Sequence, residues 1–298
     1  MQANCLIGLI FLKKWCKISL INAERKMKMT AKVLNKQYKG AVFFDVDGTL
    51  VDERKKIYRP TSATKAAITK LRETGWLVGI ATGRSKCYIP DTGIDFNCYA
   101  SCNGAVAEID NRVIFNDCIS SEEILKLSEY FEKNRIAYDI ETRDVCYFDE
   151  NRAELLEAIM KIFHIESTAF TPYKPRTAIA ANKMMIAFDR DEQFEEIKSD
   201  LSDKYQVIRH HKNNSADIMR REISKAVGIK EIIKAAEIDI ADTYAFGDDV
   251  NDIEMLSAVG CGIAMTPHSE SLEKVAKLFT GSVEEEGIST ALTKLGLI

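Results

Sequence analysis

AVFFDVDGTL, residues 41–50, is the stretch that decides the fold of this chain. Its first four residues are apolar and a Gly-Thr turn follows, which predicts a short buried strand. The strand runs into two carboxylates, Asp45 and Asp47, and burying them costs free energy unless a positive charge neutralises them. Because Mg²⁺ takes oxygen ligands and few protein carboxylates, the stretch predicts a magnesium site at the carboxyl end of a strand.

The segments on both sides of this stretch alternate between strands and helices. After the first strand, a helix capped by Thr61 or Ser62 and strands over 76–81 and 98–101 are expected. The pattern returns with a helix over 224–237 and a strand over 243–246. Such alternation with short turns is typical of an α/β fold with a doubly wound, Rossmann-like parallel sheet.

The middle of the chain has a different pattern. A capped helix starts at Ser121, two strands over 136–140 and 145–148 follow like a hairpin, and a helix is expected at about 151–163. Helices among paired strands indicate an α+β module. We therefore predict a core domain made of 38–116 and 215–298, interrupted by an α/β cap domain over 117–214.

The first 37 residues form a leader that stands outside this pattern. Its apolar run, Leu6 to Leu12, precedes its lysines, whereas a secretory signal has the positive charge first. A disordered or mis-assigned start, an extra helix and a weak membrane-surface anchor all remain open for this segment. Residues 1–37 belong to neither predicted domain.

The composition of the 298 residues narrows the partners. The net charge of −4 gives no electrostatic basis for binding nucleic acid or for stable association with an anionic membrane. The eight cysteines show neither metal-binding nor disulfide spacing, so we expect reduced thiols in a cytoplasmic protein. The oligomeric state is left open.

Several residues that end strands or begin helices fit phosphoryl transfer through a covalent intermediate. Asp45 can attack phosphorus and form an aspartyl phosphate, and Asp47 can exchange a proton with the leaving group and with water. The turn Thr82-Gly83 and the ammonium of Lys225 can bind the phosphoryl oxygens. In an open α/β sheet, ligands bind outside the carboxyl ends of the strands, which brings these groups together.

A second acidic stretch, GDDVND over 247–252, follows the strand at 243–246. Asp248 can complete the magnesium site. Asp252 lies four residues further on the same helical face, where it can orient Lys225 or a metal-bound water. The stretch is therefore predicted to serve the same site as Asp45 and Asp47.

Together these motifs resemble those of the haloacid dehalogenase-like (HAD) phosphatases. The four motifs are DVDGT at 45–49, ATGR at 81–84, Lys225 and GDDVND at 247–252. The long α+β insertion between the second and third motifs is similar to that of the Cof-type subgroup, also called subfamily IIB. The resemblance covers about residues 40–298.

The resemblance implies a role for each motif residue. Asp45 would be the nucleophile and Asp47 the general acid/base. Mg²⁺ would be held by Asp45, the Asp47 carbonyl and Asp248. Thr82, Gly83 and Lys225 would bind the phosphoryl group. Asn251 and Asp252 would support the lysine and the metal.

The inserted module is expected to choose the substrate, but its sequence indicates the residues less clearly. We name Asn103, Arg143, His210 and Asn213 as candidate substrate contacts. A lone histidine such as His210 is more often solvated or structural, and a solvated position is favoured over an anion contact for Arg143 and for Lys183. The substrate residues of the module are thus predicted only as candidates.

The leading hypothesis is a Mg²⁺-dependent phosphatase that acts on small phosphorylated metabolites, with sugar phosphates as the best guess from the resemblance. One alternative is a phosphomutase or phosphotransferase of the phosphomannomutase type. Another is a non-catalytic sugar-phosphate sensor, although a sensor needs neither a nucleophile nor an acid.

Overall fold

The computed structural model describes residues 37–148, 154, 157, 160–161, 169–173, 177–210 and 213–298. The leader, apart from residue 37, and most of the helix expected at about 151–163 lie outside the described residues. Residues 39–298 form one compact unit.

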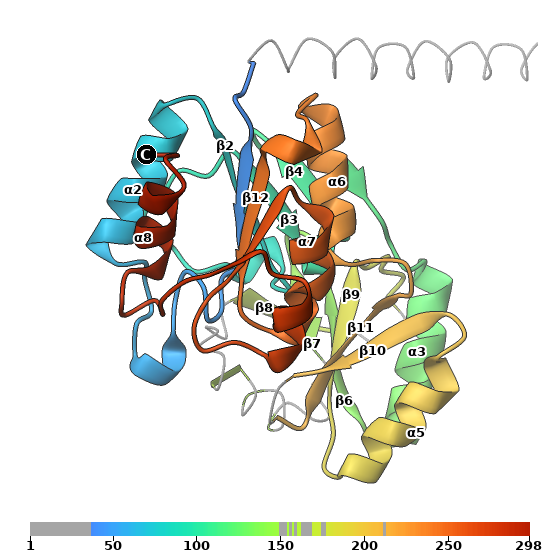
Figure 1. The fold of residues 1–298 in the computed structure, drawn as a ribbon. Coiled ribbons are helices and arrows are strands. Elements are labelled where there is room, and N and C mark those ends of the chain that lie inside the picture. Colours follow the sequence, from blue (N-terminus) through green and yellow to red (C-terminus); the bar gives the residue numbers. More distant parts are fainter. Residues whose placement is uncertain are drawn as a thin grey trace, which may run out of the picture. The chain divides into compact units, whose positions relative to one another are not determined.

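The larger sheet has eight strands in the order β14-β13-β12-β1-β2-β3-β4-β5 (Figure 1). Neighbouring strands are parallel from β14 to β3, whereas β4 and β5 are added antiparallel. The strands are β1 (Ala41–Phe44), β2 (Leu77–Ala81), β3 (Cys98–Ser101), β4 (Val106–Ile109), β5 (Arg112–Asn116), β12 (Thr243–Gly247), β13 (Cys261–Ala264) and β14 (Leu278–Phe279). The parallel sheet confirms the predicted α/β class.

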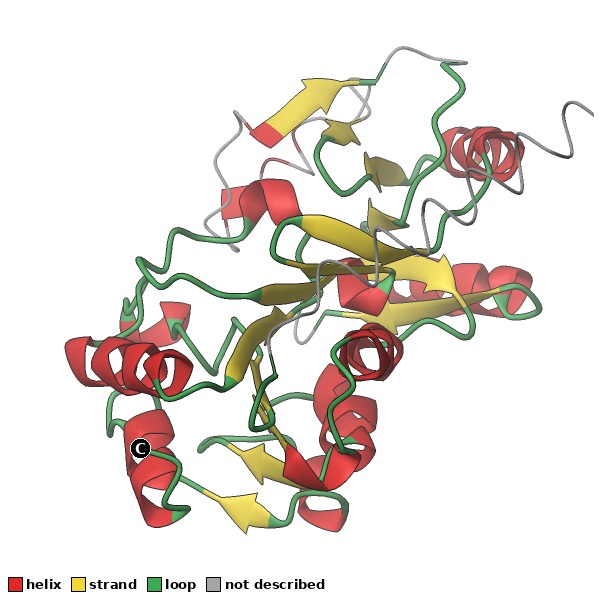
Figure 2. Ribbon diagram, turned by 90° about the horizontal axis from the view of Figure 1, so that it is seen from above, coloured by secondary structure: helices red, strands yellow, loops and turns green. Residues whose placement is uncertain are grey.

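Helices cover both faces of this sheet (Figures 1 and 2). Helices α2 (Ser62–Glu73) and α8 (Gly287–Lys294) share one hydrophobic cluster with alternate residues of β1 and β2. Helices α6 (Lys225–Ala235) and α7 (Ile253–Ala258) lie on the other side. All four residues of β1 are fully buried, as expected for a strand covered on both faces.

Short 3-10 helices connect several of these elements. One of them, over Glu270–Lys274, directly follows Ser269. These 3-10 helices include η1 (Glu53–Lys55), η2 (Lys86–Tyr88), η3 (Cys102–Gly104), η7 (Val250–Asp252) and η8 (Glu270–Lys274).

The second sheet is built from the middle of the chain and has six strands in the order β10-β11-β9-β6-β7-β8. Its pairs are antiparallel except for β7 with β8. The strands are β6 (Ala137–Glu141), β7 (Cys146–Phe148), β8 (Phe170–Pro172), β9 (Lys183–Ala187), β10 (Tyr205–Arg209) and β11 (Ser215–Arg220). We call this sheet and its helices, residues 119–220, the inserted module.

The two faces of the second sheet differ in chemistry. Helices α3 (Ser121–Lys133) and α5 (Asp191–Leu201) pack with one set of alternate strand residues in a single apolar cluster. The opposite set includes the charged residues Glu141, Lys183 and Asp217, all buried. Successive side chains on a strand point to opposite faces, so the charged set shares the face that α3 and α5 leave open.

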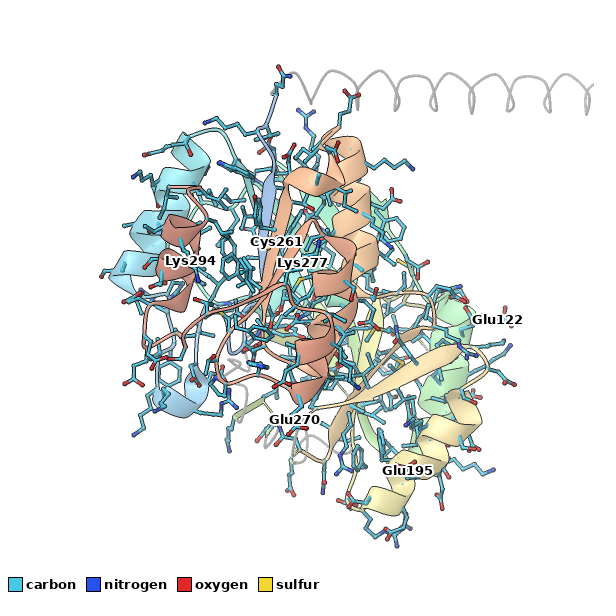
Figure 3. The ribbon with its side chains drawn as sticks, viewed as in Figure 1. Glu122, Glu195, Cys261, Glu270, Lys277 and Lys294 are labelled. Carbon is cyan, nitrogen blue, oxygen red and sulfur yellow. The ribbon has the colours of Figure 1, made fainter. Side chains whose placement is uncertain are left out.

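Exposed charged side chains mark the solvent side of several helices. Figure 3 shows Glu122 on α3, Glu195 on α5 and Lys294 on α8 pointing away from the sheets. The N-terminus of α3 has the predicted cap, because Ser120 and Glu123 form a capping box. The amphipathic pattern read from the sequence therefore corresponds to these helices.

Two sequence-based expectations need correction. The hairpin β4–β5 was not predicted, because β5 is largely exposed and lacks a clear apolar alternation. The boundary at residue 214 falls between β10 and β11, although these strands pair along their full length. We therefore place the end of the inserted module after β11, at about residue 220.

Among the described residues, the helices are all too short or too polar to cross a lipid bilayer.

Candidate active site

The carboxyl end of β1 carries both predicted aspartates. Asp45 is 4% exposed, and its backbone N–H donates to the Phe246 carbonyl oxygen at 3.0 Å, which fixes it beside β12. The chain then turns at Gly48, whose φ of +84° favours glycine. A Cβ atom at Gly48 would lie 2.1 Å from Asp248 Oδ2, so only glycine lets the two loops approach. The first and last motifs are therefore adjacent in space.

Lys225, the first residue of α6, joins two carboxylates. Its Nζ donates to Asp45 Oδ1 and to Asp252 Oδ1, each at 2.7 Å, and the side chain is 1% exposed. Burial by itself would lower the pKa of Lys225, but Asp252 and Asp45 raise it above its usual value. The amine therefore stays charged and holds one oxygen of Asp45 in place.

Asp252 uses both of its carboxylate oxygens inside the protein. Oδ1 accepts from Lys225, and Oδ2 accepts from the backbone N–H groups of Asp248 at 2.9 Å and Asp249 at 3.2 Å. The predicted contact between Asp252 and Lys225 is thus present. A Cβ atom at Gly247 would lie 2.5 Å from Asp252 Cγ, which explains the glycine before the acidic stretch.

The residues Asp45, Asp248 and Asp252 form a cluster with the composition of a metal site. Their carboxylate oxygens lie within 4.8 Å of one another, and all three side chains are buried. Burial, with Asp252 next, raises the pKa of Asp45 to about 8, and the same causes raise the pKa of Asp248 well above its usual value. Three carboxylates with one ammonium leave two negative charges uncompensated, so the cluster fits a hard divalent cation.

Asp47 has a different environment, because it pairs with an arginine. Arg84 Nε lies 2.9 Å from Asp47 Oδ2, and Nη2 lies 2.6 Å from Oδ1 and 3.0 Å from Glu53 Oε1. Burial by itself would raise the pKa of Asp47, but the Arg84 guanidinium lowers it below its usual value. Asp47 is therefore a carboxylate in this structure, held away from the Lys225 cluster.

The turn after β2 places Thr82 and Gly83 next to this pair. Thr82 is 1% exposed, and its Oγ1 accepts from the Arg84 backbone N–H at 3.1 Å. The backbone N–H of Asn103 donates to the Thr82 carbonyl oxygen at 2.9 Å. Asn103 has a φ of +53°, a left-handed conformation that asparagine tolerates. The turns after β2 and β3 are thereby held together at the same sheet edge.

A cavity of about 240 Å³ lies between this edge of the larger sheet and the inserted module. Several predicted residues line it, namely Asp45, Asp47, Gly83, Asn103, His210, Asn213 and Asn251. Thr82, Lys225, Asp248 and Asp252 are buried beside it. Arg143 is not among the lining side chains; its Nη2 lies 2.5 Å from Glu108 Oε1. The prediction of Arg143 as a substrate contact is therefore not supported, because β4 supplies its partner.

The module side of the cavity carries a buried charged network. Lys183, 2% exposed, lies 2.7 Å from Asp217 Oδ1 and 3.0 Å from Glu141 Oε1. Asp217 also contacts His210 Nε2 at 3.1 Å and accepts from Asn103 Nδ2 at 2.8 Å. Burial opposes ionisation of Asp217, but Lys183 and His210 lower its pKa. A solvated Lys183, one of the two expectations, is therefore wrong.

Sequence reasoning missed the roles of Arg84, Asp217 and Glu141. Arg84 was visible as the last residue of the ATGR motif, so its place beside Asp47 had a local signal. Asp217 and Glu141 had none, because their shared partner, Lys183, lies on another strand of the second sheet.

A family model described as haloacid dehalogenase-like hydrolase matches residues 42–292 of this chain. YkrA of Bacillus subtilis (strain 168) is 30% identical over 264 residues, which are 86% of this chain and 98% of YkrA. The 5-amino-6-(5-phospho-D-ribitylamino)uracil phosphatase YitU of the same organism is 26% identical over 265 residues, covering 84% and 95%.

Solved structures agree with these matches. The HAD subclass IIB sugar phosphatase BT4131 superposes with a TM-score of 0.74 and 26% identity, over 87% of this chain and 100% of that one. The resemblance inferred from the four motifs is thus confirmed over the same part of the chain. The chain belongs to the haloacid dehalogenase-like hydrolases and is an enzyme of the phosphatase class.

Proposed function

We propose that the protein is a Mg²⁺-dependent phosphatase that hydrolyses small sugar phosphates through an aspartyl-phosphate intermediate. The observation that carries this proposal is the position of Asp45. One of its oxygens is fixed by Lys225, a cluster suited to a divalent cation adjoins it, and Asp47 lies two residues further on the same cavity wall. A nucleophile, a countercharge and a proton carrier are the parts this chemistry needs.

In the first step Asp45 attacks phosphorus. Its Oδ1 accepts from Lys225, so Oδ2 is the oxygen that forms the new bond to phosphorus. The ester oxygen departs and takes a proton, and the phosphoryl group stays on Asp45. The Lys225 ammonium and the Thr82 hydroxyl would bind the equatorial oxygens, where negative charge develops.

In the second step Asp47 takes a proton from the water that attacks the aspartyl phosphate. Its pairing with Arg84 suits this step, because it keeps Asp47 ionised. For the first step, Asp47 has to leave Arg84 and take up a proton from solvent, which it then gives to the departing ester oxygen. Arg84 and Glu53 are therefore proposed to position Asp47.

The Mg²⁺ ion would be held by Asp45, Asp248 and the backbone carbonyl of Asp47, with Asn251 and Asp252 in support. When bound, it would offset the repulsion between the Asp45 carboxylate and the phosphate dianion. Because Asp252 already uses both oxygens, we assign it to orienting Lys225 and the Asp248 loop rather than to the metal.

The first test is phosphate release from p-nitrophenyl phosphate and a panel of sugar phosphates. We expect release with Mg²⁺ and a loss of about 100-fold or more in EDTA, restored by added Mg²⁺, since the cluster lacks its countercharge without the ion. Equal rates in EDTA would contradict metal dependence. Release that needs a second sugar as acceptor would indicate a phosphotransferase instead.

The inserted module is proposed to act as a cap that selects a neutral leaving group. Among the residues that the structure describes, the three lysines and arginines lining the cavity each face a carboxylate: Arg84 faces Asp47, Lys183 faces Asp217, and Arg209 faces Asp191 at 2.6 Å. A second anionic group on the substrate would therefore meet paired cations and additional carboxylates. A sugar or polyol, which only needs hydrogen bonds, fits this wall better.

A matched pair of esters tests this selection. We expect kcat/KM for glucose 6-phosphate to exceed that for 6-phosphogluconate, which adds a carboxylate at the far end, by about tenfold or more. Replacing Asp217→Asn should narrow this difference in kcat/KM, because Lys183 then has less countercharge and can attract the added carboxylate. Asp144→Asn, an exposed carboxylate beside Arg143, serves as the control. Equal kcat/KM values for the two esters would contradict a neutral leaving group while leaving phosphatase activity intact.

The expected cytoplasmic location stays a prediction from the cysteine pattern. The expected absence of nucleic-acid and membrane partners stays a prediction from the net charge.

A further inference from the structure

Two cysteines meet where the larger sheet adjoins the inserted module. Cys87 lies in η2, the short turn that follows the ATGR motif, and Cys146 is the first residue of β7. Their Sγ atoms are 3.2 Å apart, although 59 residues separate them in the sequence. A disulfide bond is about 2.05 Å long, so the sulfur atoms need to approach by only about 1 Å.

The two thiols differ in access and in acidity. Cys87 is half-buried, whereas Cys146 is fully buried. The hydrogen bond with Cys146 lowers the pKa of Cys87, although burial opposes this effect. The same hydrogen bond, together with burial, raises the pKa of Cys146. Because the thiolate is the reactive form, Cys87 is the thiol that a dissolved oxidant reaches first and that reacts with it first.

We propose that Cys87 and Cys146 form an oxidation site, at which a peroxide produces a disulfide between the turn after β2 and the inserted module. The Cys87 thiolate attacks hydrogen peroxide, an S–O bond forms, the O–O bond breaks, and hydroxide leaves. Cys146 sulfur then attacks the resulting sulfenic acid. The S–S bond forms, the S–O bond breaks, and water leaves with the Cys146 proton. Two thiols are oxidised by two electrons, and one peroxide is reduced to two waters.

The disulfide would add a covalent bond between the turn after β2 and the inserted module, which hydrogen bonds already connect. Ser85 Oγ donates to the Thr142 carbonyl oxygen, and Tyr88 Oη donates to Glu141 Oε2 at 2.6 Å. The two donors, Ser85 and Tyr88, flank Cys87 in the chain. The two acceptors, on Thr142 and Glu141, lie in the β6–β7 hairpin. Ser85 directly follows Arg84, the partner of Asp47. Oxidation would therefore fix the module against the turn that positions Asp47.

This placement predicts a reversible effect on turnover. A cap commonly has to move for substrate entry and product release, and such motions limit many turnover rates. We expect the oxidised enzyme to lose about tenfold in kcat. A thiol reductant should restore the activity, because it reopens the S–S bond without altering the catalytic residues.

The test is a brief treatment of the full chain with hydrogen peroxide, followed by tryptic peptide mapping without reduction. We expect a cross-linked peptide pair containing Cys87 and Cys146, and a fall in kcat toward p-nitrophenyl phosphate that dithiothreitol reverses. Cys87→Ser and Cys146→Ser should each abolish both effects. Cys118→Ser is the matched control, because that thiol is also half-buried but contacts Asn116 instead.

Three outcomes would contradict the proposal. Cys87 could appear as sulfinic acid with no cross-link to Cys146, or the cross-linked peptides could join other cysteines. A Cys87–Cys146 disulfide with unchanged kcat would exclude the effect on turnover. The peptide map does not depend on catalysis, so its result stands apart from the proposed phosphatase reaction.

Discussion

Replacing Asp45→Asn should reduce phosphate release by about 10⁴-fold or more while leaving the fold intact. The substitution keeps the shape of the side chain but removes the carboxylate that we propose attacks phosphorus. It also removes a buried carboxylate from a cluster in which three carboxylates face one ammonium. The raised pKa of Asp45 indicates this excess of negative charge. The melting temperature in EDTA should therefore equal or exceed that of the unmodified protein.

The measurement is single-turnover phosphate release with Mg²⁺, paired with thermal unfolding in EDTA. Asp144→Asn is the control, because its carboxylate is exposed and pairs with Arg143 away from the cavity. A trapped phosphoenzyme should be detectable by intact mass in the unmodified protein and absent from Asp45→Asn. Turnover at the normal rate in Asp45→Asn would rule out the covalent route.

Replacing Lys225→Met should harm both stability and catalysis. Methionine has a similar length and no charge, so Asp45 and Asp252 would stay buried without their ammonium partner. Breaking a buried ion pair by removing one partner costs about 3–5 kcal/mol. We also expect kcat/KM to fall by about 10²–10³-fold, because a donor to the developing charge is lost.

Urea unfolding with and without Mg²⁺ tests whether the loss of stability comes from the uncompensated carboxylates. If the loss comes from uncompensated carboxylates, excess Mg²⁺ should restore part of the stability of Lys225→Met, since a cation can neutralise the same oxygens. A midpoint of unfolding equal to that of the unmodified protein would show that Lys225 does not stabilise the cluster. Lys126→Met, which breaks an exposed pair with Glu122 on α3, is the matched control.

The site at the sheet edge was predictable because its residues follow strand ends. Asp45, Thr82 and Asp248 each come directly after an apolar strand, and the parallel pairing of β1 with β2 and β12 brings those ends together. Lys225 follows from the start of a helix recognisable by its apolar spacing. Local patterns and the rules of parallel sheets are sufficient for this part.

The cavity wall on the module was not predictable in the same way. Lys183 precedes an apolar run and could have been solvated; pairing with Asp217, 34 residues away, buries it. The register of antiparallel strands decides which of the alternate residues face one another, and single-sequence patterns do not fix that register. The boundary at 214 failed for the same reason, because β11 belongs to the second sheet through its partners.

The pairing of β1 with β12 also determines when the active site can exist. Thr49 Oγ1 lies 3.4 Å from Asp248 Oδ1, although the two residues are 199 positions apart in the sequence. The chain between them therefore has to close into a long loop before they meet. Closing so long a loop is entropically costly and slows folding. A nascent chain that has emerged only through the second sheet already contains Asp45 but lacks its lysine and its partner carboxylate. The proposed nucleophile is therefore synthesised early, and its site is complete only when about the last quarter of the protein has folded onto β1.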